Sequence, residues 1–372
     1  MNLLILTHVP HIIDKNQYFA YSPYVREMNV WGKFVEEMII VAPLNQNLKT
    51  EIDIEYNHKN IKFIKIKSFN LIGFKAQMNA FLKIPKIIFQ IFKAMKNADH
   101  IHLRCPGNIG LLGCLVQILF PSKSKTAKYA GNWDPNTRQP YSYKLQQWLL
   151  NNTFLTKNMQ VLVYGEWAGS SRNIKPFFTA TYQESEIKPL IVKNFNGCIK
   201  FVIVGTLVDG KNPLFAIQLI ENLNNLGYEV SLNLYGDGIL KEKLHLYITE
   251  KNLQDIVFLN GNQNKETIKK AYQDSHFVVL PSESEGWPKA VAEGMFWGCV
   301  PVSSPVSCVP FMLDFGKRGV LLKMDLKNDT AALSLLLKNE QTFQTKSKLA
   351  KEWSNIYTLD FFEQEIRLFL QR

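Results

Sequence analysis

The sequence of 372 residues lacks several features that mark common classes of protein. It has only five cysteines, an odd number without a CxxC pair, which argues against a disulfide framework and a zinc site. Charged residues make up only 20% and hydrophobic residues 46%, which excludes a disordered chain and a coiled coil. The longest apolar run, residues 109–120, is too short to span a bilayer. No basic segment precedes the first hydrophobic run, so we expect no signal peptide and a soluble cytoplasmic protein with reduced thiols.

Acidic residues are nearly missing from one long stretch of the chain. Residues 56–165 contain sixteen basic residues but only Asp99 and Asp134, a balance of +14, whereas the whole chain carries +11. In the densest part, residues 59–96, lysines alternate with large apolar residues, which suits an anionic membrane surface or an anionic substrate. The alternative is a solvated helix face whose apolar side belongs to the core. No RNA- or DNA-binding motif accompanies the charge, so we expect no nucleic-acid partner.

Short apolar runs typical of strands alternate with helical patterns along the chain. In the first half we expect strands at residues 3–7, 38–42, 61–66, 100–103, 126–130 and 159–164. In the second half we expect them at residues 201–204, 230–234, 256–259, 277–280, 300–303 and 320–322. Strands separated by helices form parallel sheets covered on both faces, so the pattern predicts two doubly wound, Rossmann-like α/β domains. Their break is expected near residues 186–200, and residues 359–370 are expected to form an amphipathic helix.

One stretch of the second half combines a strand end, a polar loop and a helix start. Residues 278–304 read VVLPSESEGWPKAVAEGMFWGCVPVSS. We expect Pro288 at the first helical position and Gly298 just beyond the helix end. A glycine-containing loop at a helix N-terminus can bind an anion through backbone N–H groups. Glu285 and Glu293 are eight residues apart, too far for a close carboxylate pair, but they could bind hydroxyls of one extended ligand such as a sugar nucleotide.

This stretch resembles the E-x7-E signature of the retaining GT-B glycosyltransferases of family four, known as glycosyl transferases group 1. Three further elements resemble the same family in the same order: V-G-T-L with Lys211, Y-G-D-G at residues 235–238, and F-L-N-G at residues 258–261. Each element alone is weak, because Gly-Asp-Gly is an ordinary turn and Lys289 with Glu293 could form a plain surface pair. Together they cover about residues 200–322 in register, which makes the resemblance strong.

The resemblance implies transfer of a sugar from a nucleotide diphosphate sugar to a hydroxyl, with no metal and no other cofactor. It implies that Glu285 holds the transferred sugar and that Lys211 stabilises charge on the leaving diphosphate, as the catalytic residues. Glu293 would accept hydrogen bonds from the ribose hydroxyls. The other implied donor-binding residues are Gly205, Thr206, Gly236, Gly238, Leu259, Asn260, Gly286, Trp287, Pro288 and Lys289. Because Thr206 stands where the family usually has an arginine, Arg104 or Lys289 would have to supply the missing charge.

The first half carries weaker signals. Residues 99–104 resemble a family strand that ends near the reacting centre, with Arg104 in place of a second histidine. An arginine there could contact a donor phosphate or an anionic acceptor but could not act as a base. The segment Asn-Trp-Asp-Pro at residues 132–135 could stack on a sugar ring, or could be only a structured turn, and His102 could be a core residue. The acceptor-binding candidates are His8, His102, Arg104, Trp133 and Asp134.

We therefore expect a GT-B enzyme with two Rossmann-like domains that face a central cleft. The acceptor domain would cover residues 1–189, with a helix at residues 355–372 packing back on it, and the donor domain would cover residues 190–354. We expect it to act in cell-surface polysaccharide or glycolipid synthesis, at the inner face of the membrane through residues 59–96. The donor base, UDP, GDP or ADP, stays open. So do two other classes: a nucleotide-sugar epimerase or phosphorylase on the same fold, and a non-catalytic protein that binds sugar nucleotides.

Overall fold

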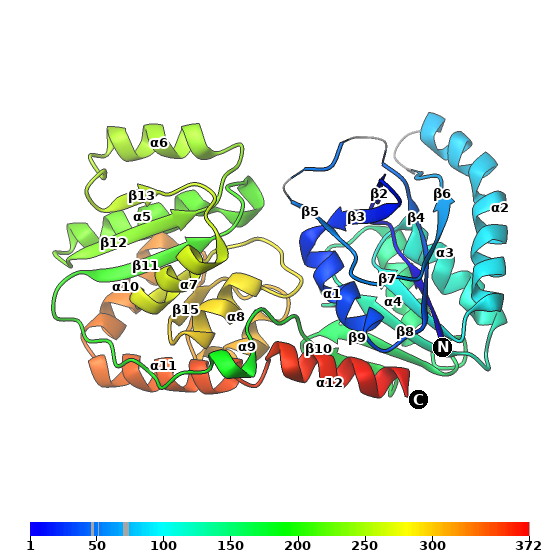
Figure 1. Cartoon of the computed structure of the whole chain (residues 1–372). Coiled ribbons are helices and arrows are strands. Elements are labelled where there is room, and N and C mark those ends of the chain that lie inside the picture. The colour runs from blue at the N-terminus through cyan, green and yellow to red at the C-terminus, as the bar shows by residue number, and fades with distance from the viewer. Residues whose placement is uncertain (46–47, 51, 70–73, 372) are drawn as a thin grey trace. The chain divides into compact units, whose positions relative to one another are not determined.

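The computed structural model describes residues 1–45, 48–50, 52–69 and 74–371 (Figure 1). Residues 70–73 of the basic stretch, including Leu71 and Ile72, thus lie outside the described residues. The chain divides into two compact units, Met1–Phe177 with Glu363–Arg372, and Phe178–Phe362. Residues 178–189 and 355–362, which the sequence analysis assigns to the first domain, group with the second unit. The cause is aromatic packing: Phe178 lies 4.8 Å from Tyr357 and 5.3 Å from Phe361 between ring centroids.

The first unit is built on a parallel sheet with the strand order β10-β9-β8-β7-β1-β4-β6. Its strands are β1 (Asn2–Leu6), β4 (Glu37–Pro43), β6 (Ile61–Ile66), β7 (His100–Cys105), β8 (Ser124–Tyr129), β9 (Met159–Tyr164) and β10 (Ile174–Phe177). Its helices are α1 (Ser22–Gly32), α2 (Phe74–Asn97), α3 (Asn108–Val116) and α4 (Tyr141–Asn151), with the 3₁₀ turn η1 (Gln117–Leu119). The strand β10 is absent from the prediction because Lys175 and Pro176 interrupt its apolar pattern, as is typical of an edge strand.

The two faces of this sheet are covered by different helices. Leu4 and Leu6 of β1 belong to one buried cluster together with residues of α2, α3 and α4. On the opposite face, Trp31 of α1 packs against the rings of His100 and His102, with centroids 6.2 and 4.3 Å apart. Every second residue of β7 therefore faces α1, as the alternation of side chains along a strand requires.

A small antiparallel sheet accompanies the first unit. It contains β2 (Ile12–Asp14), β3 (Gln17–Tyr21) and β5 (Asp53–Glu55), with β3 in the centre. These strands are absent from the prediction, because three to five residues are too few to show a clear alternation of apolar and polar side chains.

The second unit has a parallel sheet with the order β13-β12-β11-β14-β15-β16. Its strands are β11 (Ile199–Val204), β12 (Val230–Tyr235), β13 (Val257–Leu259), β14 (Phe277–Leu280), β15 (Val300–Ser303) and β16 (Val320–Leu321). Its helices are α5 (Pro213–Asn225), α6 (Lys241–Glu250), α7 (Lys265–Asp274), α8 (Lys289–Phe296), α9 (Val309–Met312), α10 (Leu326–Leu337) and α11 (Glu340–Ser354). The 3₁₀ turns are η2 (Glu184–Glu186), η3 (Asp209–Lys211) and η4 (Asp314–Gly316). The last helix, α12 (Leu359–Leu370), begins in this unit and ends in the first.

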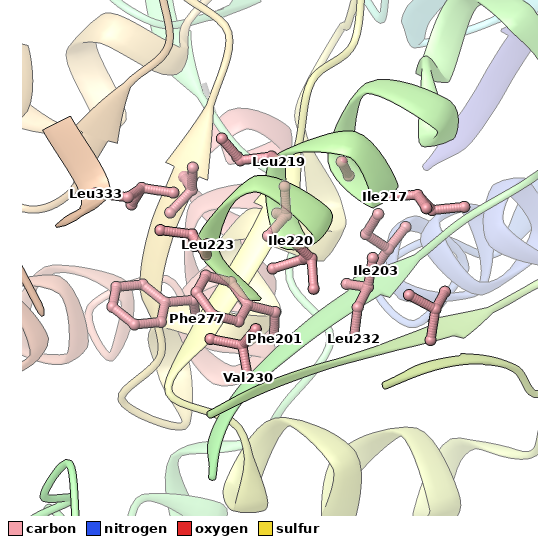
Figure 2. Close-up of a cluster of buried hydrophobic side chains, with 14 of the residues drawn as sticks. Phe201, Ile203, Ile217, Leu219, Ile220, Leu223, Val230, Leu232, Phe277 and Leu333 are labelled. Carbon is pink, nitrogen blue, oxygen red and sulfur yellow. The ribbon is translucent and has the colours of Figure 1, made fainter. Parts of the chain in front are cut away.

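Large apolar side chains fill the space between the second sheet and α5. Phe201 of β11 stacks on Phe277 of β14 with centroids 4.7 Å apart, and both rings are fully buried (Figure 2). Ile217, Leu219 and Ile220 of α5 belong to the same cluster. The prediction of two doubly wound, Rossmann-like domains is confirmed, and each of the twelve predicted strands overlaps a strand of the structure.

Each large sheet has one topological switch point, where the chain turns from one side of its first strand to the other. In the first sheet it lies between β1 and β7, and in the second between β11 and β14. Ligands of doubly wound sheets bind outside the carboxyl ends of the strands at such points. Within the described part of the chain, no helix is both long and apolar enough to cross a membrane.

Candidate functional site

Two glycine turns meet at the carboxyl edge of the second sheet. Two hydrogen bonds join the loop after β11 to the loop after β12. Gly205 N–H donates to Tyr235 O at 2.9 Å, and Leu207 N–H donates to Asp237 O at 3.0 Å. A Cβ atom on Gly236 would lie 1.9 Å from Gly205 O, so no larger residue fits at position 236 without moving the backbone. The two predicted glycine elements are thus one tightly packed structure.

The turns after β12 and β13 are also connected. Gly236 N–H donates to Gly261 O at 2.8 Å, and the Asn260 amide donates to Asn233 Oδ1 at 3.0 Å. Leu259 ends β13 and is half-buried, whereas Thr206 on the first turn is exposed. The three turns form a continuous rim over β11, β12 and β13.

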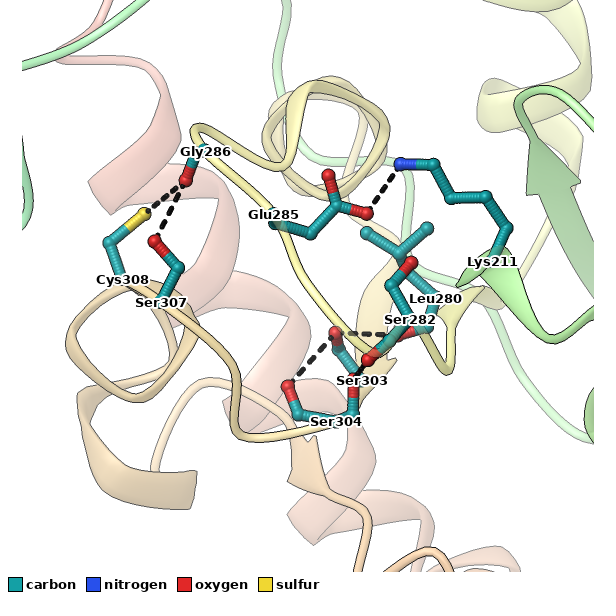
Figure 3. A network of polar contacts seen from close by, with 9 residues as sticks. All are labelled: Lys211, Leu280, Ser282, Glu285, Gly286, Ser303, Ser304, Ser307 and Cys308. Carbon is teal, nitrogen blue, oxygen red and sulfur yellow. Dashed lines mark hydrogen bonds and ion pairs between the residues drawn. The ribbon is translucent and has the colours of Figure 1, made fainter. Parts of the chain in front are cut away.

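Lys211 and Glu285 form an ion pair across the switch point of this sheet. Lys211 follows β11 within η3, Glu285 follows β14, and their Nζ and Oε1 atoms are 2.5 Å apart (Figure 3). The side chain of Glu285 is 9% exposed and that of Lys211 33%. A second link supports the pair, because the Glu283 N–H donates to Gly210 O at 2.9 Å. The two residues that the family resemblance names as catalytic are in direct contact.

The loop that carries Glu285 is fixed by hydroxyl and thiol groups from the end of β15 and the segment after it. Ser304 Oγ donates to Ser282 O at 2.5 Å, and Ser303 Oγ donates to Leu280 O at 2.8 Å (Figure 3). Ser307 Oγ and Cys308 Sγ donate to Gly286 O at 3.1 and 3.4 Å. These four residues are not among the predicted site residues. Their signal is the serine-rich segment SSPVSC at residues 303–308, which begins at the last residue of a buried strand.

Glu293 lies one turn into the helix that follows this loop, α8, which begins at Lys289. Its carboxylate accepts hydrogen bonds from Thr181 Oγ1 at 2.7 Å and from the Tyr272 hydroxyl at 3.3 Å. Lys289 Nζ is 3.9 Å away, and the Glu293 side chain is 14% exposed. Burial, followed by the charge of Glu293, raises the pKa of Tyr272, so this phenol stays a hydrogen-bond donor. Glu293 is therefore a carboxylate in a setting that already binds hydroxyl groups.

Trp287 and Pro288 have structural places in the loop. Trp287 is buried and stacks on Trp353, with centroids 6.1 Å apart. Pro288 is the residue before the helix rather than its first residue, because its ψ of 83° is not helical, and α8 begins at Lys289. Gly298 adopts a φ of +80° directly after the last cap residue, as predicted. The side chain of Trp287 is thus part of the core. The preceding residue, Gly286, is held through its carbonyl oxygen by Ser307 and Cys308.

A buried charge cluster lies at the carboxyl ends of β7 and β8 in the first unit. Arg104 Nη1 is 2.8 Å from Glu27 Oε1, and Lys128 Nζ is 3.0 Å from Glu27 Oε2. Arg104 and Lys128 are register partners on adjacent strands, and Glu27 comes from α1. Burial disfavours the charged form of Glu27, but Arg104 and Lys128 outweigh it and lower its pKa to about 2. Glu27 and Lys128 were not predicted. The sequence features that could have indicated them are an acidic residue on the apolar face of a helix, for Glu27, and a lysine inside a buried strand, for Lys128.

The two histidines named as acceptor-binding candidates have different surroundings. His102 is fully buried, and its Nδ1 lies 2.9 Å from Thr126 Oγ1. Burial lowers the pKa of His102 to about 3, so the ring is neutral and offers no surface to a ligand in this structure. His8 follows β1 and is exposed, and a Cβ atom on Gly107 would lie 3.0 Å from its Nδ1. Partial desolvation and then the charge of Arg104 lower the pKa of His8.

The segment at residues 132–135 forms a structured turn. Asn132 Oδ1 accepts from the Asp134 N–H at 2.9 Å, and Asp134 Oδ1 accepts from the Asn136 N–H at 2.9 Å. Trp133 is buried and packs edge-on against Tyr129, with centroids 4.9 Å apart. Of the acceptor-binding candidates, only His8 and Arg104 flank the switch point of the first sheet. Among the described residues, no group of three or more His, Cys, Asp or Glu side chains could hold a metal ion.

Comparisons with known proteins give a family for the second unit. Residues 190–355 match the family model of the glycosyl transferases group 1. Protein CapJ of Staphylococcus aureus is 23% identical over 320 residues, which cover 82% of this chain and 78% of CapJ. The amylovoran biosynthesis glycosyltransferase AmsK of Erwinia amylovora is 28% identical over 145 residues, 37% of this chain and 35% of AmsK.

Solved structures give the fold of the whole chain. The lipopolysaccharide outer core galactosyltransferase WaaB has a TM-score of 0.70 at 16% identity, covering 100% of this chain and 99% of WaaB. Alr3699/HepE of Anabaena, solved with UDP and glucose, has a TM-score of 0.66 at 14% identity, covering 99% of each chain. At these identities the likeness concerns the fold alone, which is that of the GT-B proteins.

Proposed function

We propose that this chain is a glycosyltransferase, which transfers a sugar from a nucleotide diphosphate sugar to a hydroxyl group, because residues 190–355 match the glycosyl transferases group 1 model and the chain has a GT-B fold. We further propose that the anomeric configuration is retained and that no metal is needed. The donor binds to the second unit and the acceptor to the first. The similarity to a fold seen with UDP and glucose supports a nucleotide sugar as donor.

The ion pair of Lys211 and Glu285 is the observation that carries this proposal. Its 2.5 Å contact lies at the switch point where doubly wound sheets bind ligands. An ammonium group at this point can bind the diphosphate and stabilise the charge that develops as the nucleotide leaves. The carboxylate of Glu285 can then bind hydroxyls of the transferred sugar. The leaving phosphate takes the proton of the acceptor hydroxyl, so no protein nucleophile is required.

Glu293 binds the ribose of the donor in this proposal. Thr181 and Tyr272 already donate hydroxyl hydrogen bonds to its carboxylate, so ribose hydroxyls are chemically equivalent partners. Gly236 and Gly238 let the turns of the rim pack backbone against backbone, since Cβ atoms there would lie 1.9 Å from Gly205 O and 2.3 Å from Leu207 O. Lys289, whose side chain is 39% exposed, is a cation on the first turn of α8 that can supply the charge missing at Thr206.

A panel of sugar nucleotides tests donor binding. UDP-, GDP- and ADP-glucose are added to the full chain, and the thermal unfolding midpoint is measured for wild type, Lys211→Met and the control Lys241→Met. Lys241 is a suitable control because it is an exposed lysine that also forms an ion pair, with its Nζ 3.1 Å from Oδ2 of Asp237. We expect one nucleotide class to stabilise wild type and Lys241→Met equally, and Lys211→Met to lose about tenfold in affinity. Equal affinity of all three proteins would contradict the proposed role of Lys211.

We propose a cell-surface glycan or glycolipid precursor as acceptor, reached at the inner face of the membrane. The names of two similar proteins, for amylovoran biosynthesis and for the lipopolysaccharide outer core, support this class. On the described part of α2, Leu82 and Phe89 are 76% and 66% exposed among lysines. Leu82 also lines a cavity of about 260 Å³, whose lining includes four lysines, Lys65, Lys67, Lys83 and Lys86. Apolar side chains among lysines match an anionic lipid surface.

Liposome binding tests the membrane part of the proposal separately. The full chain should sediment with vesicles that contain anionic lipid at low salt, and binding should weaken as salt rises because the attraction is electrostatic. The double variant Lys83→Gln/Lys86→Gln should bind less than the control Lys327→Gln/Lys338→Gln, which removes two lysines from α10 and its end. Equal binding to neutral vesicles, or no effect of the Lys83/Lys86 change, would refute this part and leave sugar transfer untouched.

A further inference from the structure

Arg104 lies at the switch point of the first sheet, in a position comparable to that of the Lys211–Glu285 pair at the switch point of the second sheet. His8 follows β1 and Arg104 is near the end of β7, so the two residues flank this switch point. The chain directly after β7 passes beside His8, because a Cβ atom on Gly107, three residues after Arg104, would lie 3.0 Å from His8 Nδ1. The carboxyl edge of a parallel sheet at its switch point is where a ligand of this unit should bind.

Glu27, Arg104 and Lys128 form a cluster of two cations that share one carboxylate. Glu27 contacts Arg104 through one carboxylate oxygen and Lys128 through the other, at 2.8 and 3.0 Å. The side chains of Glu27 and Lys128 are 6% and 1% exposed, whereas that of Arg104 is 13% exposed. The three groups therefore carry a net charge of +1, and the accessible member is the arginine. A buried excess of charge is costly unless an opposite charge accompanies it.

Arg104 has hydrogen-bond donors to spare. Its side chain makes one hydrogen bond to the described residues, from Nη1 to Glu27, so its Nη2 and Nε groups donate to none of them. The same contact holds the guanidinium group in place, with its central carbon 5.7 Å from the ring centre of Tyr24. A fixed guanidinium with a free edge is suited to bind two oxygens of one anion.

We propose that Arg104 binds a phosphate group carried by the acceptor. This inference rests on the proposed function, because it assigns the acceptor to the first unit. A phosphate offers three terminal oxygens, so two can take the free edge of Arg104 while the third accepts a hydrogen bond from the exposed ring of His8. A carboxylate would use both of its oxygens on the arginine. The added negative charge also balances the net charge of +1.

Binding of small phosphates to the full chain tests this assignment. sn-Glycerol 3-phosphate and neutral glycerol are titrated by calorimetry into wild type, Arg104→Gln, Arg104→Lys and the control Arg172→Gln, which removes an exposed arginine of the same unit. We expect wild type and Arg172→Gln to bind the phosphate but not glycerol. Arg104→Gln should lose about tenfold in affinity and Arg104→Lys less, because lysine keeps the charge but not the fork. Unchanged binding by Arg104→Gln, or an equal loss in Arg172→Gln, would overturn the assignment.

A parallel titration with UDP distinguishes an acceptor phosphate from the donor diphosphate. If the acceptor carries the phosphate, Arg104→Gln binds UDP as wild type does, whereas Lys211→Met loses UDP affinity and keeps sn-glycerol 3-phosphate affinity. A matching loss of UDP affinity in Arg104→Gln would overturn the acceptor assignment, and failure of Lys211→Met to lose UDP would count only against the proposed donor site. Arg104→Lys guards against misfolding, because it keeps the partner charge that Glu27 needs.

Discussion

Replacing Gly236 by alanine tests how closely the two glycine turns of the second sheet approach each other. The new Cβ atom would lie 1.9 Å from Gly205 O and 2.8 Å from its carbonyl carbon, and Gly236 has a φ of +144°. The unfavourable φ costs about 1–3 kcal/mol. Pushing a packed backbone away costs about another 1–3 kcal/mol. We therefore expect the free energy of unfolding of the second unit to fall by about 2–6 kcal/mol.

Gly210→Ala is the matched control, because a Cβ atom on Gly210 would meet no heavy atom within 4 Å. We expect this variant to stay within about 0.5 kcal/mol of wild type. Urea unfolding followed by circular dichroism gives the stabilities, and hydrogen exchange of peptides from β11 and β12 shows whether the loss is located there. If Gly236→Ala were as stable as Gly210→Ala, the close approach of the two turns would be wrong.

Three further predictions concern burial and the donor site. Three buried histidines of the first unit have pKa values lowered to about 4, 4 and 3, namely His11, His100 and His102. The histidines take up protons near pH 6.5 in the unfolded chain but only near pH 3–4 in the folded unit. The free energy of unfolding should therefore fall as the pH is lowered below about 6.5, by up to about 1.4 kcal/mol per pH unit for each histidine. A urea unfolding midpoint that stays constant from pH 7 to 5 would contradict this. Trp287→Ala should cost about 3–5 kcal/mol because Trp287 is buried against Trp353, whereas the control Trp148→Ala, at a 59% exposed site, should cost far less in thermal unfolding. Glu293→Ala should weaken UDP binding about tenfold in calorimetry, and Glu352→Ala, an exposed glutamate, should not.

The parallel sheets could be predicted because their strands are buried on both faces. A run such as that of β1, with Leu3 to Leu6 fully buried, leaves a continuous apolar signal in the sequence. The small sheet of β2, β3 and β5 leaves no such signal, because its strands are short. The division at residues 177 and 178 was also not predictable, since it depends on the contacts of Phe178 with rings 179 and more residues later in the chain.

The parts of the site that follow strand ends could be predicted from the sequence, whereas the parts that depend on contacts between distant segments could not. The glycine turns and the pair of Lys211 with Glu285 follow strand ends, so the topology of a doubly wound sheet brings them to one edge. The role of Trp287 in the core depends on α11, which packs beside it from another part of the chain. The cluster of Glu27, Arg104 and Lys128 joins a helix and two strands, and the apolar segments around each residue conceal it.

Turnover of a labelled sugar nucleotide by Glu285→Gln tests whether Glu285 takes part in sugar transfer. The full chain is incubated with the nucleotide sugar that stabilises it and with a glycan hydroxyl acceptor, and the released nucleoside diphosphate and the anomeric configuration of the product are measured. We expect acceptor-dependent release with retention by wild type, and a loss of at least about 100-fold in Glu285→Gln, while the control Glu352→Gln stays active. Equal turnover by Glu285→Gln and wild type, or an epimerised donor without transfer, would contradict it.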